Sequence, residues 1–183
     1  MKLHDKEAIL AELQRGQAAL LHALKDVPED GAGRAPGPGK WSILECVEHL
    51  AVAEEYLLSQ MISARQCDAP VVDERRGALI TARGADRTTR MLSPGAGRPT
   101  GRFSTLREAT EHFLSTRGRT LGFVENANED LRCRLTTHPL LGAVNCYEML
   151  LVIAVHPRRH ALQVEEIKAA LAHAPHGDAS AGA

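Results

Sequence analysis

The stretch that decides the fold is NCYEMLLVIAVHPRRHALQVEEIKAALA, residues 145–172. In its centre His156 and His160 take positions that face inward, one turn apart. Residues four apart lie on one face of a helix, so both imidazoles should point into the protein. Burying two imidazoles without partners is costly, and a metal ion is the expected partner. The apolar positions around them recur at helical spacing: Met149, Ile153, Val164, Ile167 and Leu171.

The start and the middle of this helix carry further signals. Asn145 and Glu148 form a capping box with Asn in place of Ser or Thr, so the helix should begin there. Pro157 lies between the two histidines and lacks a backbone N–H, so the sequence predicts a kink beside the proposed ligands.

Three earlier segments show the same helical period, and few residues alternate as in a strand. Four amphipathic helices predict an all-α four-helix bundle. Residues 66–103 form a long irregular crossover between the second and third helices, with at most a short helix within 71–83. We expect one domain over residues 1–172 and a disordered tail over 173–183. The three earlier helices are expected from about Asp5 to Lys25, from Trp41 to about Met61, and from Ser104 or Thr105 to about Val124.

Polar residues interrupt the inward faces of the second and third helices. His49 lies at the flank of one apolar stripe, next to Cys46. Glu54 takes an inward position on the same helix, and Arg117 takes one on the third helix. A buried carboxylate needs a cation, so we predict a buried ion pair between Glu54 and Arg117.

Composition excludes several classes of protein. The chain has 183 residues and a formal net charge of −1, which argues against a nucleic-acid binder. No apolar run is long enough to span a bilayer, and the charged amphipathic start does not resemble a signal peptide. We therefore expect a cytoplasmic protein with reduced thiols. Its four cysteines form no CxxC pair: Cys46, Cys67, Cys133 and Cys146.

The crossover carries an excess of positive charge. Two interpretations stay open: a solvated loop, or a lid that attracts an anionic ligand. Its arginines are Arg65, Arg75, Arg76, Arg83, Arg87, Arg90, Arg98 and Arg102.

Four motifs carry a family resemblance: WSILECVEHL (41–50), SPGAGRPTGRF (93–103), HPLLGAVNCYEML (138–150) and HPRRHALQVEEI (156–167). Together they resemble the DinB-like superfamily, and within it the DinB_2 type of metal-dependent proteins. The resemblance implies a four-helix bundle that binds a divalent metal, commonly zinc or nickel. It also implies three histidine ligands, which fall on His49, His156 and His160.

The surroundings of such a site can be named from the sequence. Cys46, one turn before His49, is a less favoured fourth ligand. Glu45, Gln163 and His138 are candidates for holding the imidazoles in the correct tautomer.

Two classes of function remain open. The resemblance points to a metal-dependent enzyme, since relatives include transferases and isomerases that use low-molecular-weight thiols such as bacillithiol or mycothiol. The same three histidines also suit a metal-dependent hydrolase. The other class is a non-catalytic bundle that binds a metal or small ligand as an accessory protein or sensor. We expect no nucleic-acid or membrane partner, and a homodimer by base rate.

Overall fold

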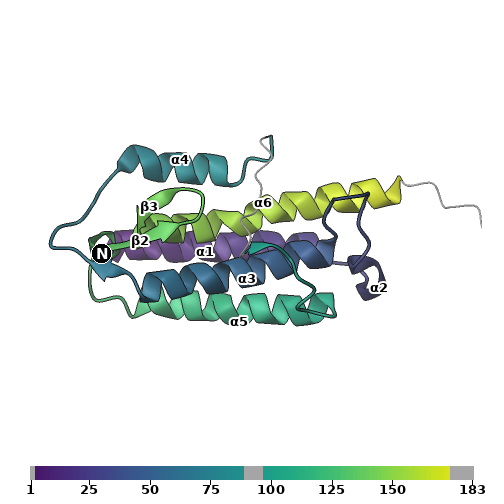
Figure 1. Cartoon of the computed structure of the whole chain (residues 1–183), viewed down its shortest axis with the longest axis horizontal. Helices are drawn as coiled ribbons and strands as arrows, with labels where there is room; N and C mark the ends of the chain where they lie inside the picture. Colours follow the sequence, from purple (N-terminus) through teal and green to yellow (C-terminus); the bar gives the residue numbers. More distant parts are fainter. Residues whose placement is uncertain (1–2, 89–96, 174–183) are drawn as a thin grey trace, which may run out of the picture.

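Four long helices lie side by side along one axis in the computed structural model, which describes residues 3–88 and 97–173 (Figure 1). This confirms the predicted all-α bundle. Within the described residues no helix has the length and apolarity needed to cross a membrane. The long helices are α1 (Leu3–Leu24), α3 (Ile43–Ile62), α5 (Leu106–Glu125) and α6 (Cys146–Ala172).

Shorter elements fill the connections. The single turn α2 (Glu29–Ala32) follows α1, and the 3-10 turn η2 (Leu131–Cys133) follows α5. In the crossover, α4 (Glu74–Gly84) confirms the short helix that the sequence allowed. Three short strands also occur that the sequence pattern did not indicate: β1 (Arg65–Gln66), β2 (Arg134–His138) and β3 (Gly142–Asn145) form an antiparallel sheet in the order β1-β2-β3. Elements this short carry too few residues for a periodic signal.

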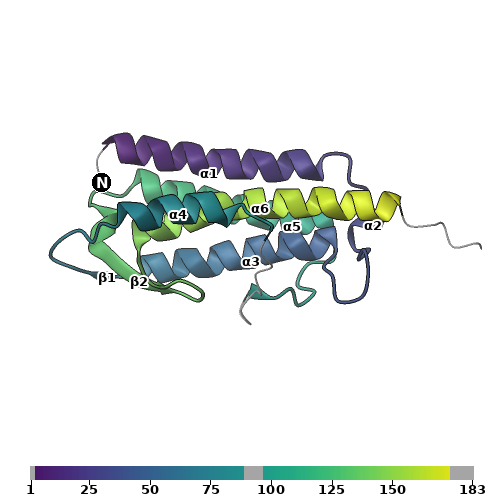
Figure 2. The same cartoon turned by 90° about the horizontal axis from the view of Figure 1, so that it is seen from above.

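The helices do not follow a simple up-down-up-down path. α1 and α6 run in one direction, whereas α3 and α5 run in the other (Figures 1 and 2). α1 packs on α6, α3 packs on α5, and α3 also packs on α6. The crossover allows α3 and α5 to be parallel, and α4 packs along α6 on the outside of the bundle.

Capping follows the sequence closely. Ser42 with Glu45 caps α3, and Asn145 with Glu148 caps α6, each as a complete capping box. At α5 a capping box is only half formed. The Thr105 side chain accepts from the Glu108 N–H, whereas the Glu108 carboxylate accepts from the backbone N–H of Ser104.

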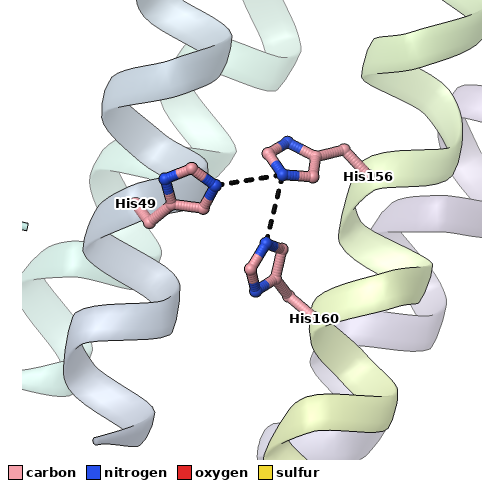
Figure 3. Close-up of side chains that lie close together, drawn as sticks. All are labelled: His49, His156 and His160. Atoms are coloured by element: carbon pink, nitrogen blue, oxygen red, sulfur yellow. Dashed lines mark hydrogen bonds between the residues drawn. The ribbon is translucent and has the colours of Figure 1, made fainter. Parts of the chain in front are cut away.

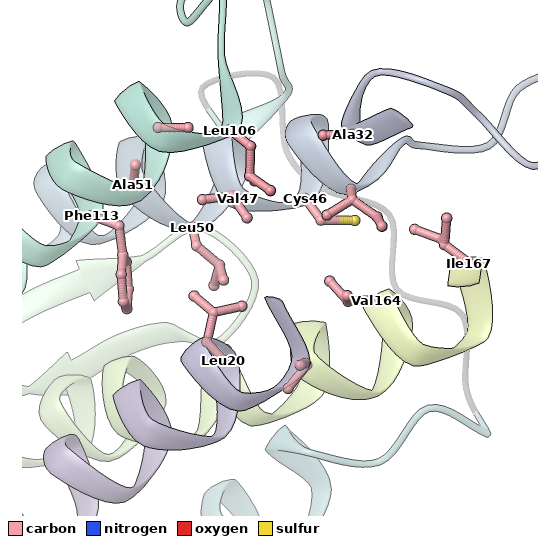
Figure 4. Close-up of a cluster of buried hydrophobic side chains, with 14 of the residues drawn as sticks. Leu20, Ala32, Cys46, Val47, Leu50, Ala51, Leu106, Phe113, Val164 and Ile167 are labelled. Atoms are coloured by element: carbon pink, nitrogen blue, oxygen red, sulfur yellow. The ribbon is translucent and has the colours of Figure 1, made fainter. Parts of the chain in front are cut away.

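The core consists of two apolar clusters. Figure 4 shows the one near the start of α3, where Leu20, Leu50, Phe113 and Val164 come from the four long helices. The second cluster surrounds Met149 at the start of α6. Between them lies a layer of buried polar side chains, which an apolar interior tolerates only when each group is hydrogen-bonded.

Arg117 is the centre of this polar layer, with its side chain fully buried. Nε and Nη2 donate to the two carboxylate oxygens of Glu54 at 2.8 and 2.7 Å, which confirms the predicted ion pair. Nη1 donates to the carbonyl oxygen of Leu13 at 2.6 Å, and Nη2 also donates to that of Ile153 at 3.2 Å. The Thr120 hydroxyl also donates to a carboxylate oxygen of Glu54, at 2.8 Å. One guanidinium therefore joins α1, α3, α5 and α6.

Arg117 also explains how α6 continues through Pro157. In a regular helix the carbonyl of Ile153 would accept from residue 157, which has no N–H because it is a proline. Arg117 supplies the missing donor. α1 approaches the next carbonyl so closely that a Cβ at Gly16 would clash with the Ala154 oxygen.

Replacing Arg117 by Ala should lower the free energy of unfolding by about 3–5 kcal/mol, because Glu54 would stay buried without its cation. Urea unfolding of both proteins measures this difference. Arg119→Ala is the matched control: Arg119 is 53% exposed, lies on the same helix and contacts Glu55 only at 3.9 Å. The control should change stability by less than about 1 kcal/mol. Equal midpoints for Arg117→Ala and the parent would contradict the role of this pair.

Candidate metal centre

Three histidines meet between α3 and α6. His49 lies on the second turn of α3, and His156 and His160 lie one turn apart on α6, facing it (Figure 3). The Nε2 atom of His156 is 3.0 Å from that of His49 and 3.1 Å from that of His160. In the described part of the chain they form the one group of at least three potential metal-ligating side chains, with all ligand atoms within 4.8 Å.

Hydrogen bonding alone does not account for this geometry. A ring nitrogen carries either one in-plane N–H or one in-plane lone pair, so His156 Nε2 can make only one good hydrogen bond. It has two close nitrogen neighbours. Two nitrogens bound to one ion at about 2.0–2.1 Å would be roughly 2.9–3.4 Å apart for octahedral to tetrahedral angles. Both spacings measured from His156 fall in that range, and all three ligand atoms lie within 4.8 Å of one another, as a shared divalent cation requires.

The electrostatic environment keeps these imidazoles neutral. Burial lowers the pKa of His49, although its hydrogen bond to a backbone carbonyl acts in the opposite direction. Burial, followed by the neighbouring imidazoles, lowers the pKa of His156 and His160 well below the usual value. Neutral imidazole is the form that binds a metal, so the site is ready for one near neutral pH.

Outer contacts orient two of the rings. His49 Nδ1 pairs with the carbonyl oxygen of Gly97, which fixes the proton on Nδ1 and leaves the Nε2 lone pair for the centre. The centroid of the Trp41 ring lies 5.0 Å from that of the His49 ring. The Trp41 ring also stacks on the His160 ring, with centroids 6.3 Å apart. His160 Nδ1 is buried without a hydrogen-bond partner among the residues that the structure describes.

Glu48 positions the carbonyl that contacts His49. Its buried carboxylate accepts from the backbone N–H of Thr100 at 2.6 Å and of Arg102 at 3.1 Å. This anchors the end of the crossover against α3 and so holds Gly97 beside His49. Sequence reasoning missed Glu48 and Gly97, because the contacts are to backbone groups about 50 residues away and leave no side-chain pattern.

A large cleft of about 1440 Å³ opens beside the three histidines. Its walls come from α3, α4, α6 and the β2–β3 turn. The loop that precedes α3 and the end of the crossover also contribute. Three half-exposed leucines give it one apolar side: Leu79, Leu140 and Leu141. Basic residues line other parts of it: Lys40, Arg76, Arg83, Arg87, Arg98 and Arg159.

The other predicted site residues fall into different places. Cys46 is buried in the apolar core and lies outside the ligand cluster, and burial raises the pKa of its thiol to about 12. The structure therefore does not bring Cys46 into the group of the three histidines. Glu45 caps α3 instead of contacting an imidazole. Glu54 and Arg117 bond to each other, to Thr120 and to backbone carbonyls, not to the three histidines.

Gln163 and His138 line the cleft but do not hold the ligands. The Gln163 side-chain oxygen accepts from Arg87 at 3.0 Å. The single lone pair of His138 Nδ1 is shared by the backbone N–H groups of Leu140 and Leu141, at 3.1 and 3.2 Å. A neutral imidazole carries a single proton, so His138 should carry it on Nε2. Burial lowers the pKa of His138, which favours that neutral form.

The lid hypothesis remains a prediction. Arg76, Arg83, Arg87 and Arg98 do line the cleft, whereas Arg87 is already engaged by Glu166 through two hydrogen bonds of 2.9 and 2.6 Å. Arg90 and the tail beyond His173 lie outside the described residues.

Comparison with known proteins identifies the family. The DinB superfamily model, DinB_2, matches residues 12–164. The chain belongs to the DinB superfamily. A curated relative, the uncharacterized protein YuaE of Bacillus subtilis (strain 168), is 23% identical over 145 residues, which cover 79% of this chain and 88% of YuaE.

Two solved DinB-like structures share the fold. YfiT of Bacillus subtilis, described as a probable metal-dependent hydrolase with an unusual four-helix bundle topology, has a TM-score of 0.59 at 13% identity. The match covers 94% of this chain and 90% of YfiT. TT2238, described as a four-helix bundle protein, has a TM-score of 0.57 at 19% identity, over 88% of this chain and 98% of TT2238. At such identities these likenesses show the fold.

The lowered histidine pKa values predict a pH-dependent stability of the metal-free protein. Above about pH 6.5, the usual histidine pKa, both folded and unfolded states hold neutral imidazoles and no penalty applies. Below this pH the histidines bind protons in the unfolded chain but stay neutral in the folded site, so the free energy of unfolding should fall from pH 7 to 5.5. Chemical unfolding in EDTA measures this slope. His156→Gln combined with His160→Gln should flatten it, whereas the exposed His22→Gln should not; an unchanged slope in the double variant would contradict the assignment.

Proposed function

We propose that this DinB protein is a metal-dependent enzyme in which His49, His156 and His160 hold a divalent cation, zinc or nickel. The observation that carries the proposal is the pair of short Nε2 contacts at His156, which bring nitrogens of three imidazoles together where one ring nitrogen can make only one good hydrogen bond. Three neutral imidazoles, joined by no fourth potential ligand among residues 3–88 and 97–173, are the donor set of an open, catalytic site. A cation bound there would lower the pKa of a coordinated thiol or water toward neutral pH.

We further propose that the nucleophile is a low-molecular-weight thiol, used in an S-transferase or isomerase reaction. A hydrolase usually needs a free general base beside the attacking water. The two carboxylates that line the cleft are both engaged in the described structure. Glu166 is bound by Arg87, and Asp86 accepts from the backbone and hydroxyl of Thr88. A thiol needs such a base less than water does, because its own pKa of about 8.5 is already close to neutral before a cation lowers it.

The cleft residues then supply binding and orientation. Exposed Arg83 and Arg98 provide positive charge for the carboxylates of an acidic thiol. The Nε2–H of His138 provides a donor for a substrate oxygen, since Nδ1 is occupied. Leu79 and Leu140 provide an apolar surface for the second substrate. These features favour an anionic thiol together with a partly apolar electrophile.

Hydrolysis is the second candidate function, because YfiT is described as a probable metal-dependent hydrolase. A non-catalytic sensor is the third outcome, in which a metal is bound and no thiol or electrophile changes its environment.

Metal content is the first measurement. Tag-free protein loaded with zinc or nickel and desalted should contain about one metal ion per chain by mass spectrometry. His156→Ala should lose it, because two imidazoles are a poor site. His22→Ala, an exposed histidine of α1, is the matched control and should keep it. No retained metal in the parent would overturn the proposal.

Cobalt-substituted protein separates the functions. Addition of an acidic thiol such as glutathione should shift the visible Co(II) absorption and introduce a sulfur-to-metal charge-transfer band. Arg83→Ala with Arg98→Ala should raise the thiol concentration required by about tenfold, while the spectrum without thiol stays unchanged. A spectrum that does not change on addition of thiols, together with turnover of an ester or amide, would establish the hydrolase instead. No response to thiols and no turnover of an ester or amide would support the sensor function.

A further inference from the structure

Cys67 and Cys133 face each other at the edge of the small sheet, away from the histidine site. In the antiparallel pairing of β1 with β2, Gln66 lies opposite Arg134. Just beyond this two-pair ladder the Cys67 N–H donates to the Cys133 carbonyl at 2.8 Å, whereas the Cys133 N–H bonds back to the Asp130 carbonyl at the end of η2. The two cysteines therefore lie next to each other where the ladder ends.

The spacing suits a disulfide bond. Opposed residues of an antiparallel ladder have Cα atoms about 4.5–5.5 Å apart, and a disulfide spans roughly 4.4–6.8 Å, so neighbours at the end of the ladder are within its reach. The Sγ atom of Cys67 lies 3.1 Å from the carbonyl oxygen of Cys133, so its side chain already points toward the neighbouring strand. Both cysteines are free thiols and only partly buried, so a small reagent can reach them.

The other two cysteines differ in every respect. Cys46 and Cys146 are fully buried, one in each apolar cluster of the core. Burial raises the pKa of Cys46 to about 12 and that of Cys146 to about 11. Neither thiol is available to a reagent in solution, which makes them an internal control.

We propose that Cys67 and Cys133 are a modification site that takes up a reversible cross-strand disulfide by exchange with a low-molecular-weight disulfide. The Cys67 thiolate attacks one sulfur of the small disulfide, whose S–S bond breaks and releases one small thiol. The Cys133 thiolate then attacks Sγ of Cys67 and displaces the second small thiol. Two protein thiols are oxidised, one small disulfide is reduced, and the two protons end on the released thiols.

The order of attack follows from the surroundings. Burial and the negative charge of Asp130 raise the pKa of Cys133, so it is poor in thiolate and resolves the mixed disulfide instead of forming it. The bond would join two segments that lead to the cleft. Cys67 precedes α4, whereas Cys133 precedes β2, the strand that ends at His138. The inference does not depend on the proposed metal chemistry.

The experiment uses the full-length reduced protein and oxidised glutathione. Intact mass should fall by two hydrogens, thiols titrated after unfolding should fall from four to two, and proteolytic mapping should link the peptides that contain Cys67 and Cys133. Cys133→Ser should stop at a stable adduct of one glutathione on Cys67. The double variant Cys67→Ser with Cys133→Ser should gain no adduct in the same time, since its remaining thiols are buried.

Several results would overturn the proposal. They are a parent protein that does not react, one that retains glutathione on either cysteine without forming the link, or a bond to Cys46, Cys146 or a second chain. Urea-unfolded protein is the matched reference. There the sheet register is lost, so all four cysteines should react and the specific link should not predominate.

Discussion

The bundle depends on the buried guanidinium of Arg117. Placing a charge in an apolar interior is stabilising only when every donor has a partner, so this group constrains whatever surrounds it. Glu54 on α3 and the carbonyls of Leu13 on α1 and Ile153 on α6 must all stand within hydrogen-bond distance of it. The apolar clusters on either side could tolerate small shifts of one helix along another. The polar layer between them tolerates much less, and so sets the relative height of α3 and α6.

That register is also what assembles the three histidines. His49 lies less than two turns from Glu54 on α3, and His156 lies less than one turn from Ile153 on α6. Fixing the two anchor points by hydrogen bonds therefore fixes the separation of the imidazoles. Pro157 belongs to the same arrangement. It leaves a carbonyl without a donor beside the site, Arg117 satisfies it, and Gly16 lets α1 pack against the next turn. Prolines inside a helix usually destabilise it, and here the interior supplies the compensation.

What the sequence could predict is what repeats locally. Helical periodicity identified the four long helices, and the inward positions of Glu54 and Arg117 identified their pairing, because both signals are visible within a few turns. The three strands were missed because β1 has two residues and its pairing with β2 joins distant parts of the chain. The Gly97 carbonyl and the Glu48 carboxylate were missed for the same reason. Each acts through a backbone group of a segment whose path no local pattern specifies.

The histidines and the cleft that serves them are built from different kinds of structure. Rigid helices α3 and α6 carry the imidazoles, whereas much of the cleft wall comes from α4, the β2–β3 turn and the end of the crossover. A fold shared at 13–19% identity therefore says little about the substrate, because function lies in the site and its walls. In this chain those walls set exposed arginines beside half-exposed leucines, close to a histidine whose free nitrogen is a donor. Under the proposed function, such a surface would select a ligand with an acidic part and an apolar part, and this chemistry, more than the three histidines, should distinguish the protein from others with the same bundle.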